Sequence, residues 1–189
     1  MNPTESWGRY PKVEQESRAI RWRHEQLPIA DGDASVLPYG QGRSYGDSCL
    51  NADGVLLTTA ELSRFIQFDK ETGILRCEAG VTLEHVINHV MPYGWFLPVS
   101  PGTKFVSVAG ALANDIHGKN HHQAGNFGHH VRAFELLRSD GERLVCTPEQ
   151  NQDYFIATIG GLGLTGFITW VEFQLIPVNN VYIDNENIR

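Results

Sequence analysis

The stretch PYGQGRSYGD (residues 38–47) holds three glycines within seven residues and follows a short run, residues 35–37, that predicts a β-strand. Glycine adopts positive φ at little cost and lets the backbone approach a ligand closely. Consecutive backbone N–H groups on such a turn can form an anion-binding nest, which the Ser44 hydroxyl would extend. The spacing alone supports a pyrophosphate-binding loop and a plain glycine turn equally.

Two glycine patterns come near a dinucleotide-binding fingerprint without its structural context. Residues 40–46 read G-x-G-x-x-x-G, one residue too long, and a polar loop beginning with Asp47 and Ser48 follows instead of a helix. Residues 161–166 (GLGLTG) do match G-x-G-x-x-G, but they lie between a predicted helix and a predicted strand, the reverse of the required order. We therefore expect no Rossmann fold and interpret the second pattern as a tight turn.

Along the rest of the chain, predicted strands and helices are mixed without a regular βαβ order, which predicts the α+β class. Two pairs of strands are separated by turns of hairpin length at residues 70–73 and 139–142. Strands are predicted at residues 54–59, 65–69, 74–78, 95–99, 131–137, 143–146 and 166–176. Helices are predicted at residues 14–25, from the cap Thr82 to Pro92, at residues 106–115 and at residues 151–159.

Composition limits the class of protein. With 189 residues and 41% hydrophobic content, the chain can form one domain or two intimately packed lobes. A net charge of −7 argues against a nucleic-acid surface, and the one basic cluster, Arg18, Arg21, Arg23 and His24, is flanked by glutamates and indicates a solvated face. No apolar run approaches the roughly 20 residues of a membrane span, and the N-terminus lacks the apolar core of a signal peptide, so we expect a cytoplasmic protein.

Residues 116–130 hold five of the eight histidines and have neither helical nor strand periodicity. His117 and His121 are four apart, but the glycine and asparagine between them disfavour a helix, and no nearby carboxylate or thiolate completes an obvious zinc set. His85 and His89 are four apart on a predicted helix, where a solvent-facing pair is the commoner case. We expect no metal, and a histidine-rich metal-binding protein remains an alternative.

Three cysteines, Cys49, Cys77 and Cys146, are widely spaced and include no C-x-x-C pair. This spacing suggests neither a disulfide framework nor a zinc knuckle. Cys77 lies in the apolar alternation ILRCEAG, which favours a small buried thiol over a reactive one.

Taken in order, PYGQGRSYGD, PGTKFVSVAGALANDIHGKNHH and GGLGLTGFI resemble the FAD-binding domain of the vanillyl-alcohol-oxidase-type flavoproteins. Within that superfamily the chain most resembles the decaprenylphosphoryl-ribose oxidase family, which the opening SWGR (residues 6–9) also fits. The resemblance covers nearly the whole chain, and DIHGKNHH is its most specific part. It implies a two-lobed, PCMH-type α+β domain with FAD between the lobes.

The same resemblance implies the division of the chain and the residues that contact the cofactor. Residues 1–30 would be a lead-in, residues 31–178 the FAD-binding domain, and residues 179–189 the start of a connection to a substrate-binding domain that the chain lacks. Residues 38–48, here called the first loop, would wrap the pyrophosphate, and Ile168 would contact FAD through its backbone. The first-loop residues are Pro38, Tyr39, Gly40, Gln41, Gly42, Arg43, Ser44, Tyr45, Gly46, Asp47 and Ser48. The residues expected along the ring-side half of FAD are Gly102, Ser107, Val108, Ala109, Gly110, Asn114, Asp115, Ile116 and His117.

Many members of this superfamily attach the flavin covalently through a histidine in the first loop, and some add a cysteine in a second loop. Here Arg43 occupies the first position and no cysteine lies between Val81 and Glu142, so we expect FAD to bind without a covalent bond. The expected chemistry is hydride transfer to the flavin from a CH–OH group of a sugar or a polyprenyl-phosphoryl sugar. His117 is the candidate polar group at the ring, and Lys119 the candidate group facing the polar end of the substrate.

Other interpretations remain open. Without the resemblance, His117 and Lys119 would be an ordinary loop histidine and a solvated lysine. The chain could belong to a sugar-lactone or polyol oxidase, or it could be a non-catalytic nucleotide-binding module that has lost its substrate domain. An exposed apolar face is expected where that domain would dock, and self-association through this face is a further hypothesis.

Overall fold

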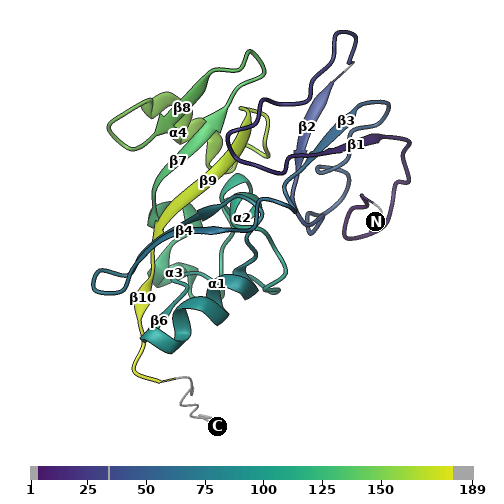
Figure 1. Ribbon diagram of the computed structural model, residues 1–189. Helices are drawn as coiled ribbons and strands as arrows, with labels where there is room; N and C mark the ends of the chain where they lie inside the picture. The colour runs from purple at the N-terminus through teal and green to yellow at the C-terminus, as the bar shows by residue number, and fades with distance from the viewer. Residues whose placement is uncertain (1–3, 34, 181–189) are drawn as a thin grey trace.

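The computed structural model describes residues 4–33 and 35–180, so most of the predicted connection at residues 179–189 lies outside the described residues (Figure 1). The fold mixes sheets with short helices, as the sequence predicts. The strands are β1 (Glu16–Ala19), β2 (Val36–Tyr39), β3 (Val55–Thr58), β4 (Phe65–Asp69), β5 (Ile74–Glu78), β6 (Trp95–Phe96), β7 (Val131–Leu137), β8 (Arg143–Cys146), β9 (Phe167–Gln174) and β10 (Ile176–Pro177). The helices are α1 (Leu83–Val90), α2 (Val108–Ala113), α3 (His121–Ala124) and α4 (Gln152–Thr158), with 3-10 turns at Met91–Tyr93 and Phe127–His130.

A small parallel sheet, in the order β1-β3-β2, is formed by the first third of the chain and lies at the upper right of Figure 1. The helix predicted at residues 14–25 is wrong. Strand β1 takes part of that segment because its backbone bonds to the β3 edge: the Glu16 N–H donates to the Gly54 carbonyl and the Ile20 N–H to the Thr58 carbonyl. Residues 20–33 then cross toward β2 without a helix.

A five-stranded antiparallel sheet, in the order β4-β5-β9-β7-β8, forms the larger part of the molecule. Both predicted hairpins, β4–β5 and β7–β8, are confirmed, and the long strand β9 joins them. Helices α1 and α2 bury apolar side chains in the core that they share with this sheet, and that core includes Val86, Leu112, Phe173 and Leu75. Strands β6 and β10 form a separate two-stranded ribbon.

Helix α1 begins where the sequence predicts, because the Thr82 hydroxyl accepts a hydrogen bond from the His85 N–H. His85 is exposed, but the expectation that His89 also faces solvent is wrong. The ring of His89 stacks on Phe65 with 4.1 Å between centroids and is half-buried. Cross-strand aromatic packing from β4, which helical periodicity does not show, therefore covers this second histidine.

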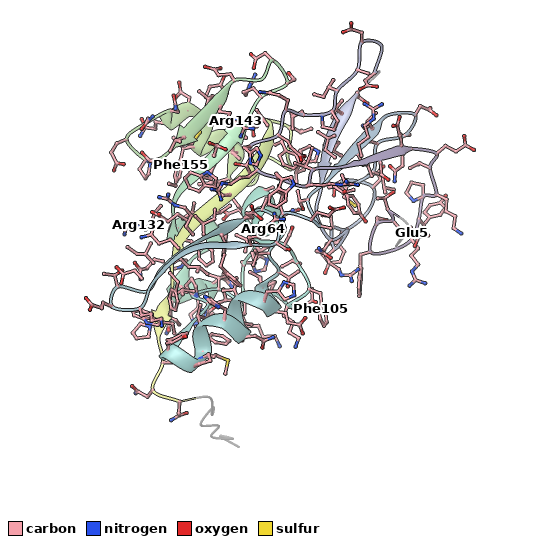
Figure 2. All side chains as sticks on the ribbon, in the orientation of Figure 1. Glu5, Arg64, Phe105, Arg132, Arg143 and Phe155 are labelled. Atoms are coloured by element: carbon pink, nitrogen blue, oxygen red, sulfur yellow. The ribbon has the colours of Figure 1, made fainter. Side chains whose placement is uncertain are left out.

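The two larger sheets are joined by a tight crossing of the backbone. The Gly80 N–H donates to the Leu62 carbonyl at 2.8 Å, and a Cβ on Gly80 would collide with the carbonyl oxygen of Thr59. Beside this crossing, the carboxylate of Glu78, only 2% exposed, accepts from the backbone N–H of Arg64 and from its guanidinium. Arg64 lies near the middle of the molecule, between the sheets (Figure 2).

Replacing Gly80 with alanine should lower the free energy of unfolding by about 2–3 kcal/mol, because the new methyl group meets backbone atoms that cannot move aside. Urea denaturation measures the change. Gly8→Ala is the matched control, since a Cβ at Gly8 meets nothing within 4 Å. Equal stability of the two variants would contradict this account of the crossing.

Candidate functional site

Three segments that lie far apart in the sequence meet at the boundary between the sheets: the first loop, the start of α2 with its cap Ser107, and residues 160–166. In the first loop, Gly40 packs so closely on α2 that a Cβ would lie 2.5 Å from the Ser107 Oγ. Pro38 lies against Gly163, with its ring carbons 3.5 Å from a Cβ placed there. Residues 160–166, here called the third segment, also bond to α2, because the Leu162 N–H donates to the Ala113 carbonyl at 2.8 Å.

The third segment follows α4 and leads into β9, so its interpretation as a turn is confirmed. Its position was not predicted. The G-x-G-x-x-G pattern places no helix N-terminus on a ligand, yet the turn forms one wall beside the first loop. Tertiary contact with Pro38 creates this arrangement, and no local sequence signal carries it.

The first loop presents a run of backbone donors without hydrogen-bond partners in the described part of the chain. Gly42 and Gly46 both have φ of +60°, in the left-handed region. Among the described residues, no acceptor is hydrogen-bonded to any backbone N–H from residue 40 to residue 47. Left-handed glycines with unpaired N–H groups form the nest that binds anions, so the loop fits a pyrophosphate on its own geometry.

The predicted lead-in forms a wall of the first loop, a role that sequence reasoning missed. The Tyr39 hydroxyl donates to the Glu5 carbonyl at 2.7 Å, and the Arg43 guanidinium lies 5.3 Å from the centroid of the Trp7 ring. Gln15 also bridges Thr4 to the backbone N–H that follows this loop. Glu5 accordingly lies beside the three-stranded sheet, on the side of the molecule away from Arg132 (Figure 2). The SWGR tetrapeptide was the one signal in the sequence that pointed to this segment.

Helix α2 contributes packing more than free donors. Ser107 caps it by accepting from the Gly110 N–H, while the N–H groups of Val108 and Ala109 donate to the carbonyls of Val81 and Ala79. The side chains of Val108 and Ala109 are buried. The first turn of α2 is thus anchored to the segment after β5, which fixes the surface against which Gly40 packs.

The other residues expected along the ring-side half of FAD differ in their exposure to solvent. Gly102 is exposed with open space around it, and Asn114 is exposed with its amide bonded to the Gly110 carbonyl at 2.8 Å. Ile116 is half-buried. Ile168 is buried within β9, so a ligand could reach it only through its backbone.

His117 is exposed and pairs with Asn126 as an isolated bridge, which brings the two ends of the histidine-rich segment together. Its ring lies edge-on to that of His121, with 5.5 Å between centroids. Lys119 is exposed and forms no ion pair with a described carboxylate. Within residues 4–33 and 35–180, no group of three or more His, Cys, Asp or Glu side chains is placed to hold a metal ion.

The three cysteines are free thiols in the described chain. Burial raises the pKa of Cys49 and of the fully buried Cys77, and it raises the pKa of Cys146 to about 11. The thiol form therefore predominates at neutral pH at all three, and a thiolate is the form that reacts with electrophiles or binds metals.

No helix among the described residues is long and apolar enough to cross a membrane.

Comparison with known proteins agrees with this geometry. Residues 13–147 match the family described as FAD binding domain. The chain is 42% identical over 153 residues to decaprenylphosphoryl-beta-D-ribose oxidase of Mycolicibacterium smegmatis, which covers 80% of this chain and 33% of that protein. It is 33% identical over 116 residues to human Delta(24)-sterol reductase, covering 61% of this chain and 22% of the relative. It is also 27% identical over 180 residues to mouse L-gulonolactone oxidase, covering 94% and 40%.

The chain thus spans about a third of the length of the mycobacterial relative. The family match includes the first loop, α2 and the histidine-rich segment (residues 116–130). The chain therefore belongs to the FAD binding domain family, and its cofactor is FAD.

Proposed function

We propose that this chain is the cofactor-binding part of an FAD-dependent oxidoreductase that oxidises a CH–OH group of a sugar or a polyprenyl-phosphoryl sugar. The observation that carries the proposal is the first loop, whose N–H groups have no hydrogen-bond acceptor among residues 4–33 and 35–180 and which packs on the start of α2 and on the third segment. The names of the relatives support the substrate class, since one is a decaprenylphosphoryl-ribose oxidase and another a gulonolactone oxidase.

In this proposal the two larger sheets are the cores of two lobes, and FAD lies between them. The pyrophosphate rests on the first loop. A cavity of about 210 Å³ lies at the same boundary, lined by apolar residues such as Leu57 and Phe167 and by polar ones such as Arg138 and Thr165, and this mixed lining suits the adenine end, which has apolar faces and polar edges. The ring-side half then runs along α2 toward residues 114–117.

Bound FAD supplies the hydride acceptor for alcohol oxidation. The chain's own residues position the flavin and the substrate and provide polar groups beside them. The His117 imidazole, which can donate or accept a hydrogen bond, is the polar group at the edge of the flavin ring. The Lys119 ammonium, free of any described carboxylate, offers a positive charge to the polar end of the substrate. The base and most of the substrate pocket would come from a second domain.

A sugar-lactone or polyol oxidase is the second candidate. Two relatives carry lactone oxidase names, a putative D-arabinono-1,4-lactone oxidase and the L-gulonolactone oxidase. Rapid reoxidation of the reduced flavin by air would favour this candidate. A non-catalytic module would instead bind FAD tightly without bleaching by any alcohol, even with a partner domain supplied. The cytoplasmic location and self-association stay predictions.

Non-covalent attachment follows from Arg43 at the tethering position and from three buried or half-buried thiols. Acid precipitation of the FAD-loaded chain should leave the yellow colour in the supernatant. A flavin that remains with the precipitate would contradict this expectation.

Replacing Gly40 with alanine should weaken FAD binding by at least about tenfold, because the methyl group would push the first loop away from Ser107. Titration of the chain with FAD, followed by flavin fluorescence, measures the affinity. Gly73→Ala is the control: like Gly40→Ala it places a methyl group against a side chain, here Trp95, and it adds backbone strain at a left-handed glycine, but it lies in the β4–β5 turn. The proposal fails if Gly73→Ala weakens binding as much as Gly40→Ala, or if the unaltered chain does not bind FAD.

Replacing His117 with alanine should change the absorption bands and the reduction potential of the bound flavin, while FAD affinity falls by less than about tenfold. The reason is that a group at the ring edge tunes the flavin, whereas the pyrophosphate loop supplies most of the binding. Spectra and redox titrations of the variant and of His85→Ala, an exposed histidine on α1, make the comparison. An unchanged spectrum and potential would remove His117 from the ring.

A further inference from the structure

The Asp115 carboxylate ties the two ends of the histidine-rich segment together. One of its oxygens accepts from the Gly128 N–H at 2.8 Å, and the other accepts from the Asn126 side-chain amide at 3.0 Å. The backbone repeats the connection, because the Phe127 N–H donates to the Ile116 carbonyl at 2.8 Å. Residues 117–126 therefore form a closed loop, and the Asp115 side chain connects its start to its end.

The backbone of Asp115 itself has an unusual conformation. Its φ is +41°, a left-handed conformation that costs a non-glycine residue free energy and persists only where the surroundings enforce it. Gly128 is fitted to the carboxylate as well, since a Cβ there would lie 2.9 Å from the Asp115 oxygen and 2.5 Å from a methyl carbon of Ile159. The contact between Asp115 and Gly128 thus joins a residue with a strained backbone to a glycine that has no room for a side chain.

Both carboxylate oxygens of Asp115 are occupied by protein donors, so this side chain has a structural partner on each side. The residue also lies two positions before His117, and His117 pairs directly with Asn126, the residue that Asp115 holds. The position of the His117 backbone accordingly depends on the bond between Asp115 and Asn126.

We propose that Asp115 is a positioning residue, a latch that fixes His117 by binding Asn126 and Gly128, and that its carboxylate does not contact FAD. The inference rests on the proposed function only where it concerns the flavin. The latch itself is a property of the ligand-free chain and is testable there.

Exchange of the two side chains tests the latch. Asn126→Asp places a second carboxylate beside Asp115, and like charges at hydrogen-bond distance repel. At pH 8 the amide signals of His117 and Gly128 in an NMR spectrum of the ligand-free chain should shift, and FAD affinity should fall by roughly tenfold, which corresponds to the loss of one charge-assisted hydrogen bond. Near pH 5 the pair can share a proton, so both changes should diminish.

The double variant Asp115→Asn/Asn126→Asp restores one donor and one carboxylate with their places exchanged, and asparagine tolerates the left-handed backbone at residue 115. At pH 8 it should recover the amide signals and at least most of the affinity that Asn126→Asp alone loses. His129 is the titratable group beside the pair, since its Nδ1 accepts from the Asn126 N–H. The unaltered chain and the double variant carry the same His129 and correct the pH series for it.

The control is Asp69→Asn. Its carboxylate accepts from the N–H groups of Glu71 and Thr72 in the β4–β5 turn, so it caps a turn as Asp115 does but in another part of the fold. It should leave the His117 and Gly128 signals and the FAD affinity unchanged. Failure of the double variant to recover the amide signals would overturn the latch. Recovered signals without recovered FAD affinity would show that the Asp115 carboxylate acts on FAD directly, and would overturn the positioning role.

Flavin spectra separate this proposal from the proposed function. If the unaltered chain does not bind FAD, the proposed function fails, while the amide signals still decide the latch. If the chain binds FAD and Asn126→Asp alters the amide signals without altering the flavin spectrum, the latch stands and its link to the flavin through His117 is overturned.

Discussion

The close approach of Gly40 to Ser107 is the contact on which the rest of the site depends. It brings the loop after β2 onto the first turn of α2, across 67 residues of sequence, and it exists because residue 40 has no side chain. Helix α2 can receive the loop because its own N-terminal amides are already bonded to residues 79 and 81 after β5. The third segment closes the arrangement by packing Gly163 on Pro38 and bonding to the end of α2. Glycines at two separate places, Gly40 and Gly163, therefore create one boundary between a parallel and an antiparallel sheet.

This construction explains how a chain with a net charge of −7 can receive a pyrophosphate. The attraction comes from backbone N–H dipoles held in a fixed direction, and such dipoles need no positive net charge. Arg43 is the one cationic side chain within the first loop, and its guanidinium lies over Trp7. In the proposed site, recognition of the anion thus lies in local backbone geometry, and the proposed contribution of side-chain charge comes from Lys119.

The sequence predicted the elements whose cause is local. The two hairpins follow from alternation and short turns, and α1 begins at Thr82 because a hydroxyl cap is a local signal. Strand β1 was missed because it is stabilised by pairing with β3, some 39 residues later, and nothing within residues 14–25 records that partner. His89 was placed in solvent for the same reason, since Phe65 reaches it from another strand. The first loop was identified as a candidate, but the packing of Glu5 and Gly163 around it, and the bonds from Asp115 to Asn126 and Gly128, join segments that no periodicity connects.

We infer that this chain alone forms the FAD site, with the first loop already shaped to receive the pyrophosphate. The most direct measurement is a visible absorption spectrum of the purified chain after addition of FAD and passage through a desalting column. We expect one FAD per chain to stay with the protein, with absorption bands shifted from those of free FAD. Complete loss of flavin on the column would contradict this inference, because the site would then require parts of the enzyme beyond this chain.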